Sequence, residues 1–281
     1  MLYVCGFCLG AIFGIQLGVV RKYIHFGFLL MLVPVTITLL TRGADYLSSR
    51  PSRTDDDLSE PQVLGFPNGR DILVTENGEY AYAFARVRGE LELSLIPNFS
   101  ERLSAAEARV AHSCSTLVNA GFYSEDKEPI GLFITDGREV SRWQQNRTFN
   151  GIFSVNAIGT PRITRGVPGD VLSLAVQTGP ILKENGQYLS TRMERDKSAR
   201  RVVAGVTGEN EAVFAVFYKE RSSFSGPTLE ELPEVLSEFE LRSGVALADA
   251  INLDGGSASA FVADDTMLSE LSPVGSFFCI R

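Results

Sequence analysis

The sequence has 281 residues, 44% of them hydrophobic and 21% charged, and a net charge of −8. This acidic balance argues against a nucleic-acid-binding protein, because phosphate contacts need clustered Lys and Arg. Only two histidines are present, His25 and His112. This number excludes a multi-histidine metal site, and a Ser-His-Asp hydrolase would depend entirely on His112. His112 lies on a predicted amphipathic helix, which favours an ordinary surface or half-buried position.

Two apolar runs open the chain, at residues 1–20 and 23–40, and Arg21 and Lys22 separate them. Either both runs cross the bilayer as a hairpin, or the basic pair begins a signal or anchor sequence whose apolar core follows. In both cases the basic pair stays cytoplasmic, which places the domain after residue 45 outside. We expect an uncleaved anchor, and therefore a membrane-anchored protein whose domain faces the periplasm or the cell surface.

Composition divides the chain into three regions. Residues 1–44 form the membrane anchor or signal region, and residues 45–62 form a polar linker with an acidic run. Residues 63–281 form a globular domain, and roughly 220 residues are enough to bury a substantial core.

Short strand-like runs separated by turn signals dominate this domain. Strands are predicted at residues 71–75, 80–87, 90–96, 116–118, 131–135, 139–140, 171–177, 202–206, 212–218, 250–253, 261–262 and 276–280. The dipeptides Asp136-Gly137 and Asn185-Gly186 predict tight hairpin turns, because both tolerate the left-handed backbone that such turns need.

Capping boxes predict two helices. Ser104 and Glu107 predict a helix over residues 105–111. Thr228 and Glu231 predict a second, amphipathic helix that starts at Thr228 and ends before Gly244. The whole pattern indicates an α+β domain, with a mixed, strand-rich sheet and a few packed helices, preceded by an apolar N-terminal membrane segment.

The four cysteines divide into two pairs. Cys5 and Cys8 lie in the first apolar run, where they behave as small hydrophobic residues. Cys114 and Cys279 lie in the domain, and an exported domain can carry a disulfide bond. The sequence leaves open whether these two cysteines meet.

An ordered set of short segments carries the functional signal. The segments are 119–123 (NAGFY), 129–133 (PIGLF), 136–137 (DG), 150–153 (NGIF), 177–180 (QTGP) with Leu182, Arg201 four residues before Gly205, and 252–257 (NLDGGS). In this order they resemble the phosphodiester glycosidase family, over residues 118–281. That family includes the lysosomal uncovering enzyme, which removes N-acetylglucosamine from a sugar phosphodiester, and bacterial proteins labelled as exopolysaccharide-related.

The resemblance implies three catalytic residues. Asp254 acts at the anomeric centre, because it ends a strand beside two glycines. Arg201 holds the phosphate, since arginine supplies bidentate geometry and only this residue, not Arg200, matches the family spacing to Gly205. Asn119 places its amide at the rim of the pocket. Glu125 and Asp126, which follow the first motif closely, are weaker candidates for a catalytic acid. The predicted substrate-binding residues are Gly121, Gln177, Thr178, Gly179, Asn252, Gly255 and Gly256.

The implied reaction is hydrolysis of the glycosidic bond of a sugar-1-phosphodiester in an envelope or extracellular glycan. The leaving group is a phosphomonoester whose second pKa is about 6, so a dedicated general acid is less necessary than in ordinary glycosidases. The domain contains no CxxC and no metal-ligand spacing, and no cofactor is established, although carboxylates and carbonyls would suit a divalent cation. The alternative is a non-catalytic envelope protein that binds polysaccharide or acts in exopolysaccharide assembly.

Overall fold

The computed structural model describes residues 72–88, 92–126, 128–193 and 196–281. The predicted membrane anchor at residues 1–44 and the linker at residues 45–62 lie outside these ranges. In the described part of the chain, no helix combines the length and the apolar character needed to span a membrane.

The largest sheet has seven strands in the order β1-β2-β13-β12-β14-β10-β11. Their bounds are β1 Ile72–Thr75, β2 Gly78–Val87, β13 Ala212–Tyr218, β12 Arg201–Thr207, β14 Leu247–Asn252, β10 Ile181–Glu184 and β11 Gln187–Tyr188. The central strands β13 and β12 are buried along almost their whole length, as their continuous runs of apolar residues require.

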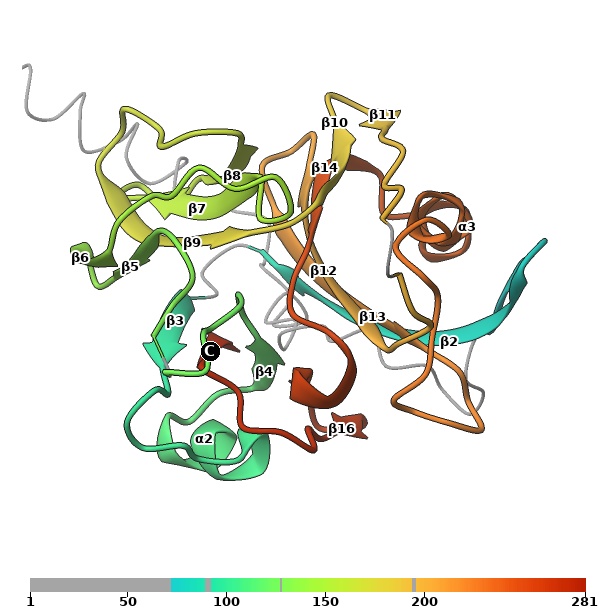
Figure 1. Ribbon diagram of the computed structural model, residues 1–281, viewed down its shortest axis with the longest axis horizontal. Coiled ribbons are helices and arrows are strands. Elements are labelled where there is room, and N and C mark those ends of the chain that lie inside the picture. Colours follow the sequence, from blue (N-terminus) through green and yellow to red (C-terminus); the bar gives the residue numbers. More distant parts are fainter. Residues whose placement is uncertain (1–71, 89–91, 127, 194–195) are drawn as a thin grey trace, which may run out of the picture. The chain divides into compact units, whose positions relative to one another are not determined.

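Two five-stranded sheets complete the domain (Figure 1). One has the order β16-β15-β4-β17-β3, and its strands are β16 Met267–Leu268, β15 Phe261–Val262, β4 Thr116–Asn119, β17 Ser276–Ile280 and β3 Leu93–Pro97. The other has the order β6-β5-β9-β7-β8, and its strands are β6 Arg138–Ser141, β5 Phe133–Thr135, β9 Leu172–Thr178, β7 Gly151–Asn156 and β8 Pro161–Thr164.

The sheets are antiparallel, so the prediction of a mixed sheet is wrong, whereas the strand-rich character with few helices is confirmed. Every strand pair among the described residues runs antiparallel. Tight turns join several neighbouring strands, including Asp136-Gly137 and Asn185-Gly186, both with positive φ as predicted. Such turns permit only antiparallel pairing, since parallel neighbours need a long crossover connection.

Three phenylalanines, one from each sheet, meet in the core. Phe153 of β7, Phe214 of β13 and Phe278 of β17 are fully buried, and their ring centroids lie 4.8–5.6 Å apart. Aromatic pairs at this separation contribute about 0.5–1.5 kcal/mol each beyond their burial. This contact therefore holds the three sheets around a shared apolar interior.

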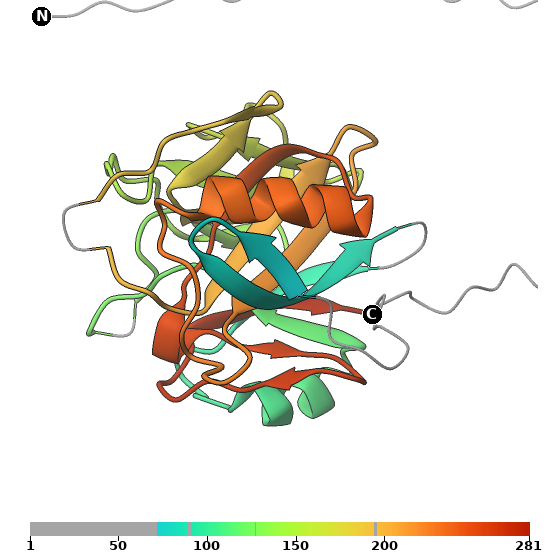
Figure 2. The ribbon, with the colours of Figure 1, turned by 90° about the vertical axis from the view of Figure 1, so that its right-hand side faces the viewer.

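Helix α3 (Leu232–Ser243) covers the outer face of the seven-stranded sheet (Figure 2). Its buried face carries Phe239, whose ring packs edge-on against Tyr82, Phe84 and Phe217 of that sheet. Gly244 ends the helix in a left-handed conformation, as predicted.

The start of α3 differs from the prediction. The reciprocal bonds between Thr228 and Glu231 form, but the helix begins only at Leu232. The reason is Pro233, which has no N–H to donate to the carbonyl of Leu229. The hydroxyl of Thr191 donates to that carbonyl instead.

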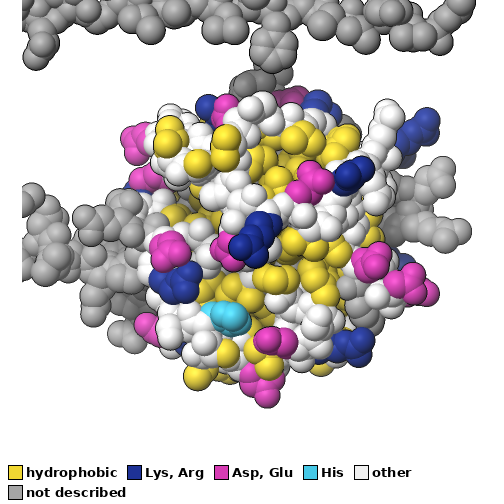
Figure 3. Space-filling view, turned by 90° about the vertical axis from the view of Figure 1, so that its left-hand side faces the viewer, with side chains coloured by type: hydrophobic (Ala, Val, Ile, Leu, Met, Phe, Trp, Pro, Cys, Tyr) yellow, Lys and Arg dark blue, Asp and Glu magenta, His cyan; other side chains and the backbone are white. Residues whose placement is uncertain are grey.

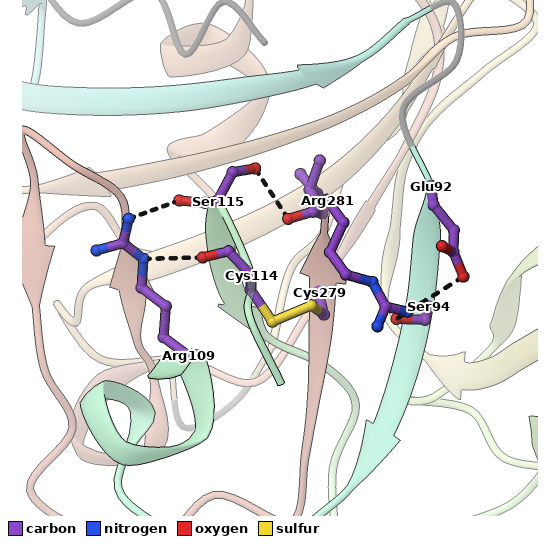
Figure 4. The surroundings of a disulfide bond; sticks show 8 residues. Glu92, Ser94, Arg109, Cys114, Ser115, Cys279 and Arg281 are labelled. Atoms are coloured by element: carbon purple, nitrogen blue, oxygen red, sulfur yellow. Dashed lines mark hydrogen bonds and ion pairs between the residues drawn. A yellow bond between two sulfur atoms is a disulfide. The ribbon is translucent and has the colours of Figure 1, made fainter. Parts of the chain in front are cut away.

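Helix α2 (Ala105–Ala111) has the predicted bounds, and its Ser104–Glu107 capping box is complete. Just after this helix, Cys114 forms a disulfide bond with Cys279 of β17 (Figure 4). Arg109 reinforces the same corner by donating to the Cys114 carbonyl. On the face that Figure 3 shows, basic and acidic side chains are interspersed among apolar ones.

Candidate active site

Arg201 and Asp254 come together at one end of the seven-stranded sheet. Strands β12 and β14 pair with Val203 opposite Asn252. The backbone bond from the Leu253 N–H to the Val202 carbonyl, 2.8 Å, extends this pairing beyond β14. The next bond to this segment runs from the Gly256 N–H to the Arg200 carbonyl, so Asp254 and Gly255 lie between the two bonds, close enough to Arg201 for its charge to lower the Asp254 pKa.

The Asp254 carboxyl group is half-buried and has an unusual environment. Burial raises its pKa to about 7 from the ordinary value of 3.8. A hydrogen bond of 2.8 Å from the Gly255 N–H to Oδ1 and the positive charge of Arg201 both lower the pKa, but they only partly offset the effect of burial. The carboxyl group therefore exchanges its proton near neutral pH, which is the range that suits acid–base catalysis.

Arg201 is also largely buried, and burial lowers its pKa, while the charges of Asp196, Asp254 and Glu231 raise it. Its Nε donates to the Pro227 carbonyl at 3.0 Å, and its Nη2 donates to Asp196 at 2.9 Å. The Nε–Nη2 edge of the guanidinium is therefore occupied by protein groups. Nη2 also donates to the Lys197 carbonyl at 2.6 Å, and among the described residues none accepts a hydrogen bond from Nη1.

Asn119 lies inside the protein and not at the rim of a pocket. Its side chain is fully buried. Nδ2 donates to the Asp254 carbonyl at 2.8 Å, and Oδ1 accepts from the Ala260 N–H at 2.9 Å. The amide thus joins the end of β4 to the segment that carries Asp254, and in this arrangement it supports the backbone instead of facing a sugar.

Gln177 has a similar position, because its amide is buried and bonded to three backbone segments. Its Oε1 accepts hydrogen bonds from the N–H groups of Leu132 and Gln144, at 3.0 and 3.1 Å. Nε2 donates to the carbonyls of Gln144 and Phe149, at 2.6 and 2.9 Å. The predicted ligand-facing amide is therefore fully engaged within the protein, where it ties together the segments around the end of β9.

Thr178, Gly179 and Asn252 tie the end of β9 to the end of β14. The Thr178 hydroxyl donates to the Asn252 carbonyl at 2.7 Å, and Asn252 Nδ2 donates to the Gly179 carbonyl at 3.0 Å. Gly179 has no room for a side chain, because a Cβ would lie 2.4 Å from the Thr148 carbonyl oxygen. The close approach predicted for Gly179 is thus made to the protein's own backbone. Asn252 Oδ1 is buried and accepts no hydrogen bond from any described residue.

The three remaining predicted glycines surround the same region. A Cβ on Gly121 would lie 2.4 Å from Val176, and one on Gly255 would lie 2.8 Å from the Arg200 carbonyl oxygen. Gly256 has a φ of 64° and begins a short 3-10 helix (Gly256–Ala258). Packing and backbone conformation are therefore sufficient reasons for glycine at these positions.

Two residues near Asp254 were not assigned roles from the sequence. Tyr123 ends the NAGFY segment, and burial together with the Asp254 charge raises its pKa. Arg200 is completely buried, whereas its neighbour Arg201 faces Asp254. Alternation along a strand could have indicated this difference, since adjacent residues point to opposite faces. Glu125 and Asp126 are exposed in the turn after Tyr123.

Two cavities lie at the opposite end of the sheets. A cavity of about 350 Å³ is lined by residues that include Ser94, Asn156 and Asn210, and a neighbouring one of about 290 Å³ also includes Asn210. None of the predicted site residues lines either cavity. Within the described ranges, no group of three His, Cys, Asp or Glu side chains is placed to hold a metal ion. The site is therefore defined by its charged and buried polar groups.

Comparison with known proteins decides the family. The family model for phosphodiester glycosidases matches residues 112–280, which include all of the predicted site residues. The chain belongs to the phosphodiester glycosidase family. The predicted resemblance is thereby confirmed, and with it the assignment to hydrolases of the phosphodiester glycosidase type. A search of curated proteins found no match.

Solved structures share the fold of this phosphodiester glycosidase family member. The catalytic domain of the zebrafish N-acetylglucosamine-1-phosphodiester alpha-N-acetylglucosaminidase is 14% identical with a TM-score of 0.61, and the match covers 76% of this chain and 81% of that one. A hypothetical protein from Synechocystis is 12% identical with a TM-score of 0.52, and the match covers 75% of this chain and 61% of that one. A protein from Burkholderia pseudomallei is 13% identical with a TM-score of 0.52, with 72% and 74% covered.

Proposed function

We propose that this protein hydrolyses the bond between the anomeric carbon of a sugar and the phosphate oxygen of a sugar-1-phosphodiester. The observation that carries the proposal is the proximity of Asp254, whose pKa is about 7, to the charge of Arg201 just beyond the paired ends of β12 and β14. Membership of the phosphodiester glycosidase family supports the same reaction class.

The leaving group determines how the two residues divide the chemistry. A phosphomonoester leaves readily, since its second pKa is about 6, so the main demand is at the anomeric carbon. In its ionised form, Asp254 stabilises the positive charge that develops there or removes the proton from the attacking water. Arg201 stabilises the phosphate through its Nη1, because a charged hydrogen bond to phosphate is among the stronger polar contacts.

The substrate is a phosphate-containing glycan outside the cytoplasm, and the chain is held at the membrane by residues 1–44. The disulfide between Cys114 and Cys279 supports an oxidising compartment, where such bonds persist. Protease added outside intact cells, after permeabilisation of an outer envelope if there is one, should digest the domain. Full protection of the domain alongside protected cytoplasmic markers would rule this location out.

The activity is tested by incubating the full chain with a panel of sugar-1-phosphodiesters and measuring the release of reducing sugar and phosphomonoester. Asp254→Asn should lower kcat while leaving KM nearly unchanged, because it removes charge with little change of shape. Arg201→Ala should mainly raise KM, by roughly 10-fold to 150-fold, as expected for the loss of a charged hydrogen bond. Arg165→Ala, at an exposed ion pair with Glu184, is the matched control and should change neither constant.

Two outcomes would contradict the proposal. Full turnover by Asp254→Asn would make Asp254 only a turn residue. If the folded parent cleaves no member of the panel but binds phosphorylated polysaccharide, the protein is a glycan-binding component of the envelope instead of an enzyme.

A further inference from the structure

Arg200 is the largest fully buried side chain among the described residues, and its guanidinium donates to a hydroxyl and to backbone carbonyls instead of a carboxylate. Its guanidinium lies 4.6 Å from the centroid of the Phe224 ring. Nη1 is buried and donates to no described residue. Burial lowers the pKa of Arg200 to about 10, with the negative charge of Glu270 acting in the opposite direction. A buried charge is expensive to maintain, so an apolar side chain would serve better if this position only filled space.

The hydrogen bonds of Arg200 converge on the segment that follows Asp254. Nε donates to the Ser259 hydroxyl at 2.8 Å, and Nη2 donates to the backbone carbonyls of Ser259 and Ser269. The Ser259 hydroxyl in turn donates to the Gly256 carbonyl at 2.7 Å. Through this relay, the charge of Arg200, which directly precedes β12, is connected to the turn that follows the candidate catalytic carboxylate.

The backbone of Arg200 also forms a hydrogen bond with this turn. Its carbonyl accepts from the Gly256 N–H at 2.8 Å. The Cβ of any residue other than glycine at position 255 would lie 2.8 Å from that carbonyl oxygen. Gly255 is thus enclosed between fixed groups, and its N–H is the one that donates to Oδ1 of Asp254.

We propose that Arg200 is a positioning residue that, through Ser259, fixes the turn at Gly255 and Gly256 and so holds the Gly255 N–H against the Asp254 carboxylate. The effect of this positioning on catalysis rests on the proposed function. Arg200 faces away from Arg201 along the strand, so it acts through the turn and not by touching substrate.

The direct test uses Ser259→Ala in the full chain. This change removes both the acceptor of Arg200 Nε and the donor to Gly256, but it deletes only one oxygen atom, so the fold is expected to persist. The Gly255 hydrogen bond lowers the pKa of Asp254, so a loosened turn should move the titration midpoint of this carboxyl group upward, by about half a unit. Carbon-detected NMR of the aspartate carboxyl groups measures this midpoint, and Asp254→Asn identifies the signal by its disappearance.

The kinetic expectation is a separate readout. Ser259→Ala should lower kcat about tenfold and leave KM within twofold, because substrate binding groups are unchanged. Arg200→Lys should show a similar upward midpoint shift, because one ammonium group cannot replace three converging N–H bonds. Leu174→Ala is the control: it removes a buried side chain at the opposite end of the sheets, and should lower the melting temperature without moving the Asp254 midpoint.

The inference is overturned if Ser259→Ala lowers the melting temperature as Leu174→Ala does but leaves the Asp254 midpoint unchanged. The NMR titration needs no substrate, so it separates this inference from the proposed function. A shifted midpoint in a protein that cleaves no phosphodiester would support the positioning role and refute the catalytic one.

Discussion

The side-chain amide of Asn119 donates a hydrogen bond to the backbone carbonyl of Asp254 at 2.8 Å, across a sequence separation of 135 residues. The other half of the same amide accepts from the Ala260 N–H. One buried side chain therefore holds both ends of the short segment that carries the candidate catalytic carboxylate. Its contribution to activity is expected to pass through the backbone of that segment.

Asn119→Ala should reduce both stability and turnover. The substitution leaves the Ala260 N–H and the Asp254 carbonyl without this partner, and a buried unpaired polar group costs about 1–3 kcal/mol. Urea unfolding followed by circular dichroism measures the stability loss. Asn98→Ala is a matched control, since Asn98 is also buried and bridges Leu103 and Val274 with its amide, away from Asp254. Equal losses of kcat in both variants would show that Asn119 has no specific link to the site.

The rate should depend on pH through the ionisation of Asp254. Because burial raises its pKa to about 7, the carboxylate form accumulates only as the pH rises through neutrality. With Asp254 acting as a base or as an anionic stabiliser, kcat/KM should rise about tenfold per pH unit below 7 and level off above it. A pH–rate profile measures this. A rate that falls through the same range would instead assign Asp254 as the acid, and a flat profile would remove it from the reaction.

The stability of the folded protein should fall as the pH rises, because of the same Asp254 carboxyl group. The folded-state pKa, about 7, lies above the ordinary value of 3.8, so the native state holds a proton that the unfolded state releases between these values. The stabilisation is complete below about pH 4 and is lost as the pH rises through 7. Asp254→Asn should therefore be more stable than the parent at pH 8, by roughly 1–3 kcal/mol, and similar to it at pH 4. Melting temperatures at the two pH values test this, and an equal difference at both would contradict it.

The disulfide should contribute to the stability of the domain. Cys114 and Cys279 are separated by 165 residues, and closing a long loop restricts the unfolded chain by roughly 3–5 kcal/mol. Denatured, unreduced protein should show no thiol from these two cysteines. Because the chain has two further cysteines, Cys5 and Cys8, the measurement is made by peptide mapping after alkylation, with the double variant Cys114→Ala and Cys279→Ala as the reference. Alkylated Cys114 in the unreduced parent would exclude the bond.

Several features were determined by the sequence alone because they depend on residues close together in the chain. The capping box at Ser104 and Glu107 sets the start of α2, and the Asp136-Gly137 turn pairs β5 with β6. The ordered motifs indicate the family, and the structure places Arg201 close enough to Asp254 for its charge to lower the Asp254 pKa. The sequence also contains Pro233, whose missing N–H explains why α3 starts four residues after Thr228, where the capping box predicts its start.

Only the tertiary structure decided which polar side chains turn inward. Asn119 and Gln177 look alike as motif residues near a site, yet both are buried and bonded to backbone groups far away in the chain. Arg200 and Arg201 are adjacent in the sequence, but their environments differ because distant segments of the chain bury Arg200 completely. The raised pKa of Asp254 likewise comes from desolvation by its surroundings. Hydrogen bonds within a turn or a helix cap are set by residues three or four positions apart, whereas burial depends on chain segments that meet only in the folded protein.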